Sequence, residues 1–241
     1  MKITAIVPVY NNVNTVLTVL NALNSSKIIS EIIVCNDSSK DNSLEVINNF
    51  SSRKIIILNN SINLGKGGTV VKAIKIAENN CIFLCDADLS KLSAQHIDKM
   101  IEEYSNKKTD MIIGYNSADD FIYFNPFLKF IRTLSGQRIL NRNLLSDYLD
   151  LIKNSGNGME QIINFALRNK SVKLIDLGDI GHILKYQRKD KLRSTLEYLK
   201  QGKQIFVTDF RLKKILSKSK EKFKIKPYLS LWHFDYQEDG V

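Results

Sequence analysis

Short apolar runs that alternate with helical periodicity constrain the fold of this 241-residue chain more than any other feature. Residues 3–9 are apolar and rich in β-branched side chains, and after them apolar residues recur at the spacing of an amphipathic helix. The alternation continues, with further strands expected at residues 31–35, 54–58, 81–85 and 110–113. Strands joined through helices form a mostly parallel sheet covered on both faces. The sequence therefore predicts an α/β fold, with a mostly parallel sheet flanked by helices.

A polar segment follows each of the first four main strands, and these segments are residues 10–12, 36–41, 64–68 and 86–90. In such sheets ligands bind beyond the carboxyl ends of the strands. Because the carboxyl ends of parallel strands meet at one edge, we expect the four segments to converge on a single binding site.

Two carboxylates, Asp86 and Asp88, end the apolar run at residues 81–85. Side chains at positions i and i+2 of a strand point the same way, so both carboxylates would face the expected site. Carboxylates this close repel each other unless a cation lies between them or one is protonated. Mg²⁺ or Mn²⁺ suits this arrangement, because it takes one or two protein carboxylates and completes its shell with phosphate oxygens and water. An acidic surface turn is the alternative, and the four converging segments favour the metal site.

Composition is that of a globular protein with one sizeable core, since 44% of the residues are hydrophobic. The sequence contains neither a long uncharged apolar run nor the pattern of a signal peptide, so we expect a cytoplasmic protein. Its three cysteines, Cys35, Cys81 and Cys85, lie in or at the ends of apolar runs, which predicts buried thiols and no disulfide framework.

The formal net charge of +10 belongs to the C-terminal part of the chain. Residues 185–226 contain fifteen Lys and Arg against four Asp and Glu, a net charge of +11. This segment is interpreted as a solvated helical surface, a contact in a homo-oligomer, or a peripheral contact with the anionic inner face of a membrane. A nucleic-acid-binding protein is the alternative class that the charge suggests. No nucleic-acid module is recognised, however, and the charge lies outside the motifs, so no nucleic acid is expected as a partner.

The second half of the chain is less regular. Residues 117–130 are rich in aromatic side chains and are interpreted either as a loop or short helix over a cleft or as core packing. Residues 135–142 are expected to precede a helix, residues 155–160 to open another, and residues 172–176 and 180–186 to form a strand pair. The remainder is expected to be helical and basic.

Four motifs in this order resemble glycosyltransferase family 2, and they are residues 7–12, 36–43, 63–68 and 86–88. The glycine-rich motif around Lys66 and residues 135–142 are similar to dolichyl- and polyprenyl-phosphate sugar synthases. Residues 156–160 and His182 look more like glucosyl-3-phosphoglycerate synthases. The resemblance implies a Rossmann-like, GT-A type domain over residues 1–187, followed by a basic helical extension over residues 188–241.

The resemblance also implies an activity. It is the metal-dependent transfer of a hexose from a nucleotide-diphosphate sugar, with UDP favoured over GDP, to a phosphorylated acceptor. The acceptor would be a polyprenyl phosphate or a small phospho-acid. The two subgroups imply opposite stereochemical outcomes, so retention and inversion of the anomeric configuration both stay open.

Individual roles follow from the resemblance. Around the donor, the nucleobase would be bordered by Pro8 and Tyr10 and hydrogen-bonded by Asp37, with Asn11 as a further substrate-binding residue. The diphosphate would contact Lys66 and the backbone of Gly65, Gly67 and Gly68. Asp88 would bind the metal, Asp86 the ribose or a metal-bound water, and His182 would complete the coordination. Arg138 and Arg142 would pair with the diphosphate or an anionic acceptor, and Gly158 and Glu160 would lie at the sugar or acceptor. The expected catalytic residues are Asp86, Asp88 and Glu160.

The sequence disfavours two further functions, a sugar nucleotidyltransferase and a non-catalytic relative that only binds a nucleotide sugar. A sugar nucleotidyltransferase needs a glycine-rich basic loop after its first strand, where this chain has Tyr10, Asn11 and Asn12. A non-catalytic nucleotide-sugar-binding relative is disfavoured by the intact pair of Asp86 and Asp88. The chain also departs from the family at Ser38, where glycine is usual.

Overall fold

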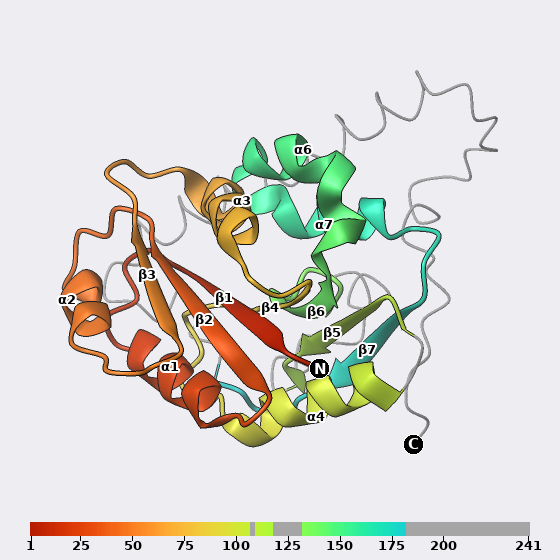
Figure 1. Ribbon diagram of the computed structural model, residues 1–241, viewed down its shortest axis with the longest axis horizontal. Coiled ribbons are helices and arrows are strands. Elements are labelled where there is room, and N and C mark those ends of the chain that lie inside the picture. Colours follow the sequence, from red (N-terminus) through yellow and green to blue (C-terminus); the bar gives the residue numbers. More distant parts are fainter. Residues whose placement is uncertain (107–108, 118–131, 182–241) are drawn as a thin grey trace.

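A computed structural model describes residues 1–106, 109–117 and 132–181 (Figure 1). Within this part of the chain one seven-stranded sheet has the order β3-β2-β1-β4-β6-β5-β7. Its strands are β1 (Ile3–Val9), β2 (Ile29–Asn36), β3 (Ile55–Asn59), β4 (Cys81–Leu84), β5 (Met111–Tyr115), β6 (Gln137–Asn141) and β7 (Val172–Asp176). The helices are α1 (Val16–Ser25), α2 (Ser43–Asn48), α3 (Gly65–Ile76), α4 (Ala94–Asn106), α6 (Leu149–Lys153) and α7 (Met159–Ala166), with 3₁₀ turns η2 (Arg142–Tyr148) and η3 (Gly156–Gly158). The predicted α/β fold is confirmed.

Four neighbouring strands, β3, β2, β1 and β4, run parallel. In this register Val7 pairs with Val34, and Ile6 pairs with Leu84. The carboxyl ends of the four strands therefore meet at one edge of the sheet, as the sequence predicted, and the four polar segments follow there.

Strand β6 was not predicted. Residues 137–141 run antiparallel to both β4 and β5 and connect the two halves of the sheet. Their apolar content is low because Gln137, Arg138 and Asn141 are polar, so the strand depends on pairing partners distant in sequence and has a weak local signal. Of the strand expected at residues 180–186, Ile180 and Gly181 are described and are not in a strand.

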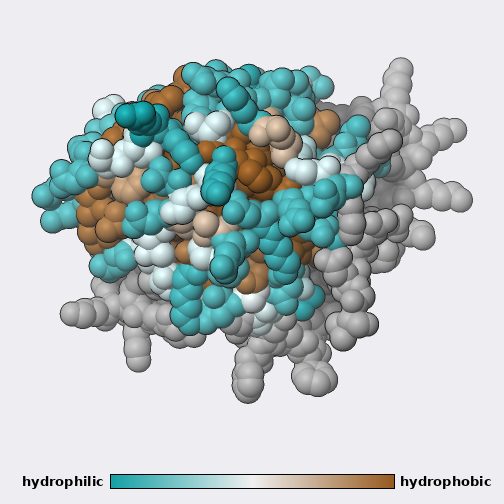
Figure 2. Space-filling model, turned by 60° about the horizontal axis from the view of Figure 1, so that its bottom comes forward, coloured by the Kyte–Doolittle hydropathy of each residue, from teal (hydrophilic) through white to brown (hydrophobic). Residues whose placement is uncertain are grey.

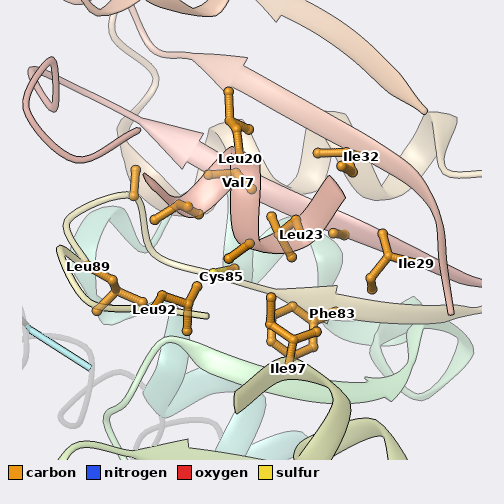
Figure 3. Packing of buried hydrophobic residues seen from close by; sticks show 14 of the residues in the cluster. Val7, Leu20, Leu23, Ile29, Ile32, Phe83, Cys85, Leu89, Leu92 and Ile97 are labelled. Atoms are coloured by element: carbon orange, nitrogen blue, oxygen red, sulfur yellow. The ribbon is translucent and has the colours of Figure 1, made fainter. Parts of the chain in front are cut away.

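Helices cover both faces of the sheet, with α1, α2 and α4 on one side and α3, α6 and α7 on the other (Figure 1). Alternate residues of each strand point to opposite faces. Val7 of β1 and Phe83 of β4 pack with Leu20 of α1 and Ile97 of α4 (Figure 3). Each such side chain stabilises the fold by about 1.5–3 kcal/mol when fully buried. The opposite face packs against α3, α6 and α7, and this is the face that carries the candidate site.

The face in Figure 2 is mostly hydrophilic, with separate apolar patches. Among the described helices, none is long and apolar enough to cross a membrane. Residues 118–130 of the aromatic segment at 117–130, the basic segment at residues 185–226 and the domain boundary near residue 187 lie outside the described residues and stay predictions.

Candidate functional site

The centre of the site is the end of β4. Ile82 and Leu84 point toward α3 and α7, and Asp86 continues this alternation beyond the strand. Gly136, just before β6, lies against the Asp86 carboxylate, and a Cβ atom at this position would collide with it. Gly136 therefore provides the space that the carboxylate occupies. The sequence did not single out this glycine, because the contact arises from the antiparallel pairing of β6 with β4.

Lys66 links three elements at this point. Its Nζ atom lies 2.5 Å from Asp86 Oδ1 at the end of β4 and 2.5 Å from Glu160 Oε1 in the first turn of α7. The side chains of Lys66 and Glu160 are 23% and 7% exposed, respectively. Burial acts to lower the pKa of Lys66, but the carboxylates of Asp86 and Glu160 outweigh it and hold that pKa above its usual value. Three residues that the sequence assigned to the site thus form one ionic cluster around a charged ammonium.

The glycines of α3 allow this cluster to form. Gly65 has a positive φ of 75° and lies against the backbone of Gly156. A Cβ atom on Gly67 would overlap the carbonyl oxygen of Ile152 in α6. Because α3 can approach α6 and η3 this closely, Lys66 reaches Glu160. The contacts expected between a phosphate and the backbone of Gly65, Gly67 and Gly68 stay predictions.

Asp37 has a structural role that the sequence did not reveal. Its carboxylate is buried and accepts hydrogen bonds from Asn60 Nδ2 (3.0 Å), Leu64 N (2.8 Å) and Gly65 N (2.9 Å). It therefore ties the end of β2 to the first turn of α3 and satisfies two of the amide groups that a helix start leaves without partners. The contact of Asp37 with a nucleobase stays a prediction.

The loops after β1 and β2 are joined to each other. Asn11 N donates to Ser39 Oγ (3.1 Å), Asn11 Oδ1 accepts from Lys40 N (2.8 Å), and Asn12 N donates to Ser43 Oγ (2.8 Å). Pro8 and Tyr10 lie at the same edge, with Tyr10 exposed. The residues predicted to border a nucleobase are thus brought together with Asp37.

The two predicted anion-binding arginines are placed differently. Arg138 is fully buried in β6, where Nη1 donates to Asn164 Oδ1 (2.6 Å) and Nε donates to the Ser135 carbonyl (2.8 Å). Arg142 donates from Nη1 to the carbonyl oxygens of Ile74 and Ala77. These carbonyls belong to the C-terminal end of α3, whereas Lys66 is at its start, so the structure does not bring Arg142 to the ionic cluster.

Three predicted site residues remain, and they are Gly158, His182 and Asp88. Gly158 precedes α7 and donates its N–H to the Ser155 carbonyl (3.0 Å), two residues before Glu160. His182 lies outside the described residues. Asp88 follows Asp86 at the carboxyl edge and is partly buried.

The carboxylates at this edge fit a divalent cation. Within the described ranges, no group of three or more His, Cys, Asp or Glu side chains is arranged to hold a metal ion. Asp86 and Asp88 nevertheless supply two carboxylates, and Mg²⁺ usually keeps several waters and takes only one or two carboxylates plus substrate phosphates. In this structure the ammonium of Lys66 is the cationic partner of Asp86.

Residues 4–152 match the family model described as Glycosyl transferase family 2. The match covers more than half of the chain, which therefore belongs to this family. The resemblance expected from the four motifs is confirmed.

Curated relatives include several enzymes named as glucosyltransferases. A UDP-Glc:alpha-D-GlcNAc-diphosphoundecaprenol beta-1,3-glucosyltransferase from Escherichia coli is 30% identical over an alignment of 164 residues that covers 61% of this chain and 65% of the relative. A dolichyl-phosphate beta-glucosyltransferase from Trichomonas vaginalis is 28% identical over an alignment of 123 residues that covers 46% of this chain and 36% of the relative. The chain thus spans less than two thirds of the length of these relatives.

Solved structures of glucosyl-3-phosphoglycerate synthase from Mycobacterium tuberculosis share the fold. One, in complex with Mn²⁺, UDP and phosphoglyceric acid, has a TM-score of 0.67 at 15% identity and covers 88% of this chain and 78% of that chain. Another, with Mg²⁺ and UDP, has a TM-score of 0.66 at 15% identity and covers 88% and 79%. At this identity the similarity establishes the GT-A type fold alone.

Proposed function

We propose that this chain is a metal-dependent glycosyltransferase that moves a hexose from a UDP-sugar to a phosphorylated acceptor. The observation that carries the proposal is the Lys66 ammonium, held 2.5 Å from both Asp86 and Glu160 where the carboxyl ends of the parallel strands meet. Family membership and relatives named for UDP-Glc support the choice of reaction and of nucleotide.

In this proposal the donor lies along the carboxyl edge of the sheet. Pro8, Tyr10 and Asp37 border the nucleobase, and Lys66 contacts the diphosphate as a compact positive charge. The fixed contacts of Asp37 with the first turn of α3 keep the nucleobase region and Lys66 at a constant separation. The site is therefore largely formed before the donor binds, which reduces the cost of ordering it.

Asp88 and Asp86 would hold the divalent cation, with His182 as a further ligand. When bound, the cation stabilises the negative charge that develops on the departing nucleoside diphosphate. Lys66 contributes to the same stabilisation from the protein side. In the reaction, the bond between C1 of the hexose and the β-phosphate oxygen breaks, and an oxygen of the acceptor bonds to C1.

A phosphorylated acceptor suits the residues that line the site. An alcohol acceptor requires a base to remove its proton, and Glu160 is the candidate for that role. A phosphate monoester has a second pKa near 6 and is mostly ionised at neutral pH, so it needs no such base. The relative named for dolichyl phosphate supports this class of acceptor. The relative named for a beta-1,3 linkage to a GlcNAc on a lipid diphosphate and the neighbour bound to phosphoglyceric acid support an acceptor that carries phosphate, with a hydroxyl as the attacking group in the beta-1,3 case. A lipid-linked acceptor would give the basic segment at residues 185–226 a membrane-facing role.

Isothermal titration calorimetry tests the proposal. UDP, GDP and their glucose and mannose conjugates are titrated into the full chain with and without Mn²⁺. We expect Mn²⁺-dependent binding of UDP and a UDP-sugar, and loss of that binding in Asp88→Ala. Asp147→Ala removes an exposed carboxylate in η2 and serves as the charge-matched control that retains binding. A folded wild type that binds no nucleotide would contradict the proposal.

A further inference from the structure

Thr15 contacts the turn that carries the two carboxylates. It is buried, and its Oγ1 atom donates a hydrogen bond to the carbonyl oxygen of Ala87 (2.6 Å), the residue between Asp86 and Asp88. Thr15 also precedes α1, at the position where a threonine usually accepts a hydrogen bond from the first N–H groups of the helix. Within α1, which is described in full, no N–H group donates to this hydroxyl. The side chain therefore holds the turn after β4 and does not cap its own helix.

The same turn is fixed at both ends by backbone hydrogen bonds. At its start Cys85 N donates to the Ile6 carbonyl of β1 (3.0 Å), and at its end Ser90 N donates to the Gly181 carbonyl (2.9 Å). The hydrogen bond from Thr15 lies between these two anchors, at the point where the carboxylates leave the backbone.

Thr15 reaches the turn from the side opposite to the ionic cluster. Ala87 belongs to the apolar core that also contains Leu20 of α1, whereas Asp86 contacts Lys66 of α3 on the other face of the sheet. The hydroxyl of Thr15 therefore acts on the carboxylates through the backbone and leaves their oxygen atoms to other partners.

Thr15 is tied to the loop after β1 as well. The Asn12 carbonyl accepts hydrogen bonds from Thr15 N (3.1 Å) and Val16 N (3.0 Å), and Asn12 N donates to Ser43 Oγ (2.8 Å). One threonine thus connects the loop proposed to border the nucleobase with the turn proposed to hold the cation.

We propose that Thr15 is a positioning residue for the divalent cation, because its hydrogen bond to Ala87 holds Asp86 and Asp88 at the separation that a shared cation requires. The inference rests on the proposed function and deepens it. Two neighbouring carboxylates repel each other while no cation lies between them. A fixed carbonyl between the two limits their separation before the cation binds, which reduces the cost of binding it.

The test replaces Thr15 by valine, which keeps the shape of the side chain and removes the hydroxyl. UDP is titrated calorimetrically into the full chain without Mn²⁺ and at increasing Mn²⁺ concentrations. Thr15→Val should need roughly 10-fold more Mn²⁺ than wild type to reach the same UDP affinity, the lower end of the range for residues that hold metal ligands in place. Without Mn²⁺ its UDP affinity should match that of wild type. Thr15→Ser keeps the hydroxyl and should restore the wild-type Mn²⁺ requirement.

Thr4→Val is the matched control. Thr4 is also buried and donates its hydroxyl to a buried acceptor, the Glu31 carboxylate, but it lies near the start of β1, at the opposite edge of the sheet. Its replacement should lower the melting temperature, because Glu31 loses a donor, and should leave the Mn²⁺ requirement unchanged. The melting temperatures of the unliganded variants set a titration temperature at which all of them are folded.

Three results would overturn the inference. They are an unchanged Mn²⁺ requirement in Thr15→Val, an equal loss of UDP affinity with and without Mn²⁺ in that variant, and an equally raised Mn²⁺ requirement in Thr4→Val. Failure of the wild type to bind UDP in the presence of Mn²⁺ would instead overturn the proposed function, and this inference with it.

Discussion

Ser38 has a backbone conformation that explains why glycine is usual at this position of the family pattern. Its φ is 61°, in the left-handed region that glycine occupies without strain. The sequence shows that a serine stands where glycine is usual, and the structure shows that the glycine conformation is retained. The residue therefore carries strain directly beside Asp37.

Replacing Ser38 by glycine should stabilise the protein. Removing the left-handed strain stabilises the folded state, and the greater freedom of glycine in the unfolded chain offsets part of that gain. We expect the free energy of unfolding to rise by about 0.5–1 kcal/mol. Urea unfolding measures the change. Ser39→Gly is the control expected to destabilise, because Ser39 Oγ accepts the hydrogen bond from Asn11 N. A less stable Ser38→Gly protein would show that the serine hydroxyl makes up for the strain.

At the residue scale, the sequence predicted the types of residue in the site better than their contacts. Asp86, Lys66 and Glu160 were each assigned from local patterns at strand ends and helix starts. Their mutual contact depends on the close packing of α3 against η3 and α6, which no local pattern encodes. Gly136 was missed for the same reason, since its importance comes only from the Asp86 carboxylate that lies against it.

At the scale of elements, Arg142 closes the C-terminal end of α3. Its guanidinium donates to the carbonyls of Ile74 and Ala77, which a helix end leaves without partners, and a positive charge there also favours the helix dipole.

Arg142→Met should therefore lower stability by about 1–3 kcal/mol, because the carbonyls lose their donor. Thermal unfolding measures this loss, and calorimetry at a temperature where the variant is folded should show unchanged UDP affinity. Selective loss of UDP affinity with unchanged stability would instead support the contact between Arg142 and the diphosphate that the sequence suggested.

The elements themselves were predictable to different degrees. The parallel strands β1 to β4 have continuous apolar runs and polar ends, so their order along the chain and their common carboxyl edge followed from the sequence. Strand β6 has a buried arginine, Arg138, as its second residue and partners far away in the chain. Its antiparallel insertion between β4 and β5 follows from tertiary pairing, which overrides a weak local signal.

For the whole molecule, the buried thiols predict a fall in stability in alkaline solution. Burial raises the pKa of Cys35 to about 12, whereas an unfolded thiol titrates near pH 8.5. Because the pKa is higher in the folded state, the stabilisation is complete below the unfolded pKa and is lost as the pH rises above it.

Between about pH 8 and about pH 10 this one thiol should reduce the free energy of unfolding by about 1.9 kcal/mol. Urea unfolding at the two pH values measures the fall. Cys35→Ala should be less stable at both, because it leaves a small cavity, but should lose less stability between them. Parallel losses in wild type and Cys35→Ala would contradict the assignment.

The account as a whole depends on Lys66 as the cation that meets the donor diphosphate. The measurement that tests this most directly is the dissociation constant of UDP with Mn²⁺ for Lys66→Gln and Lys75→Gln. Both variants lose one positive charge from α3, but Lys75 is exposed near the other end of the helix. We expect Lys66→Gln to weaken UDP binding by roughly 10–150-fold, the range for a charge-assisted hydrogen bond, and Lys75→Gln to bind as wild type does. Equal affinities in the two variants would contradict the account.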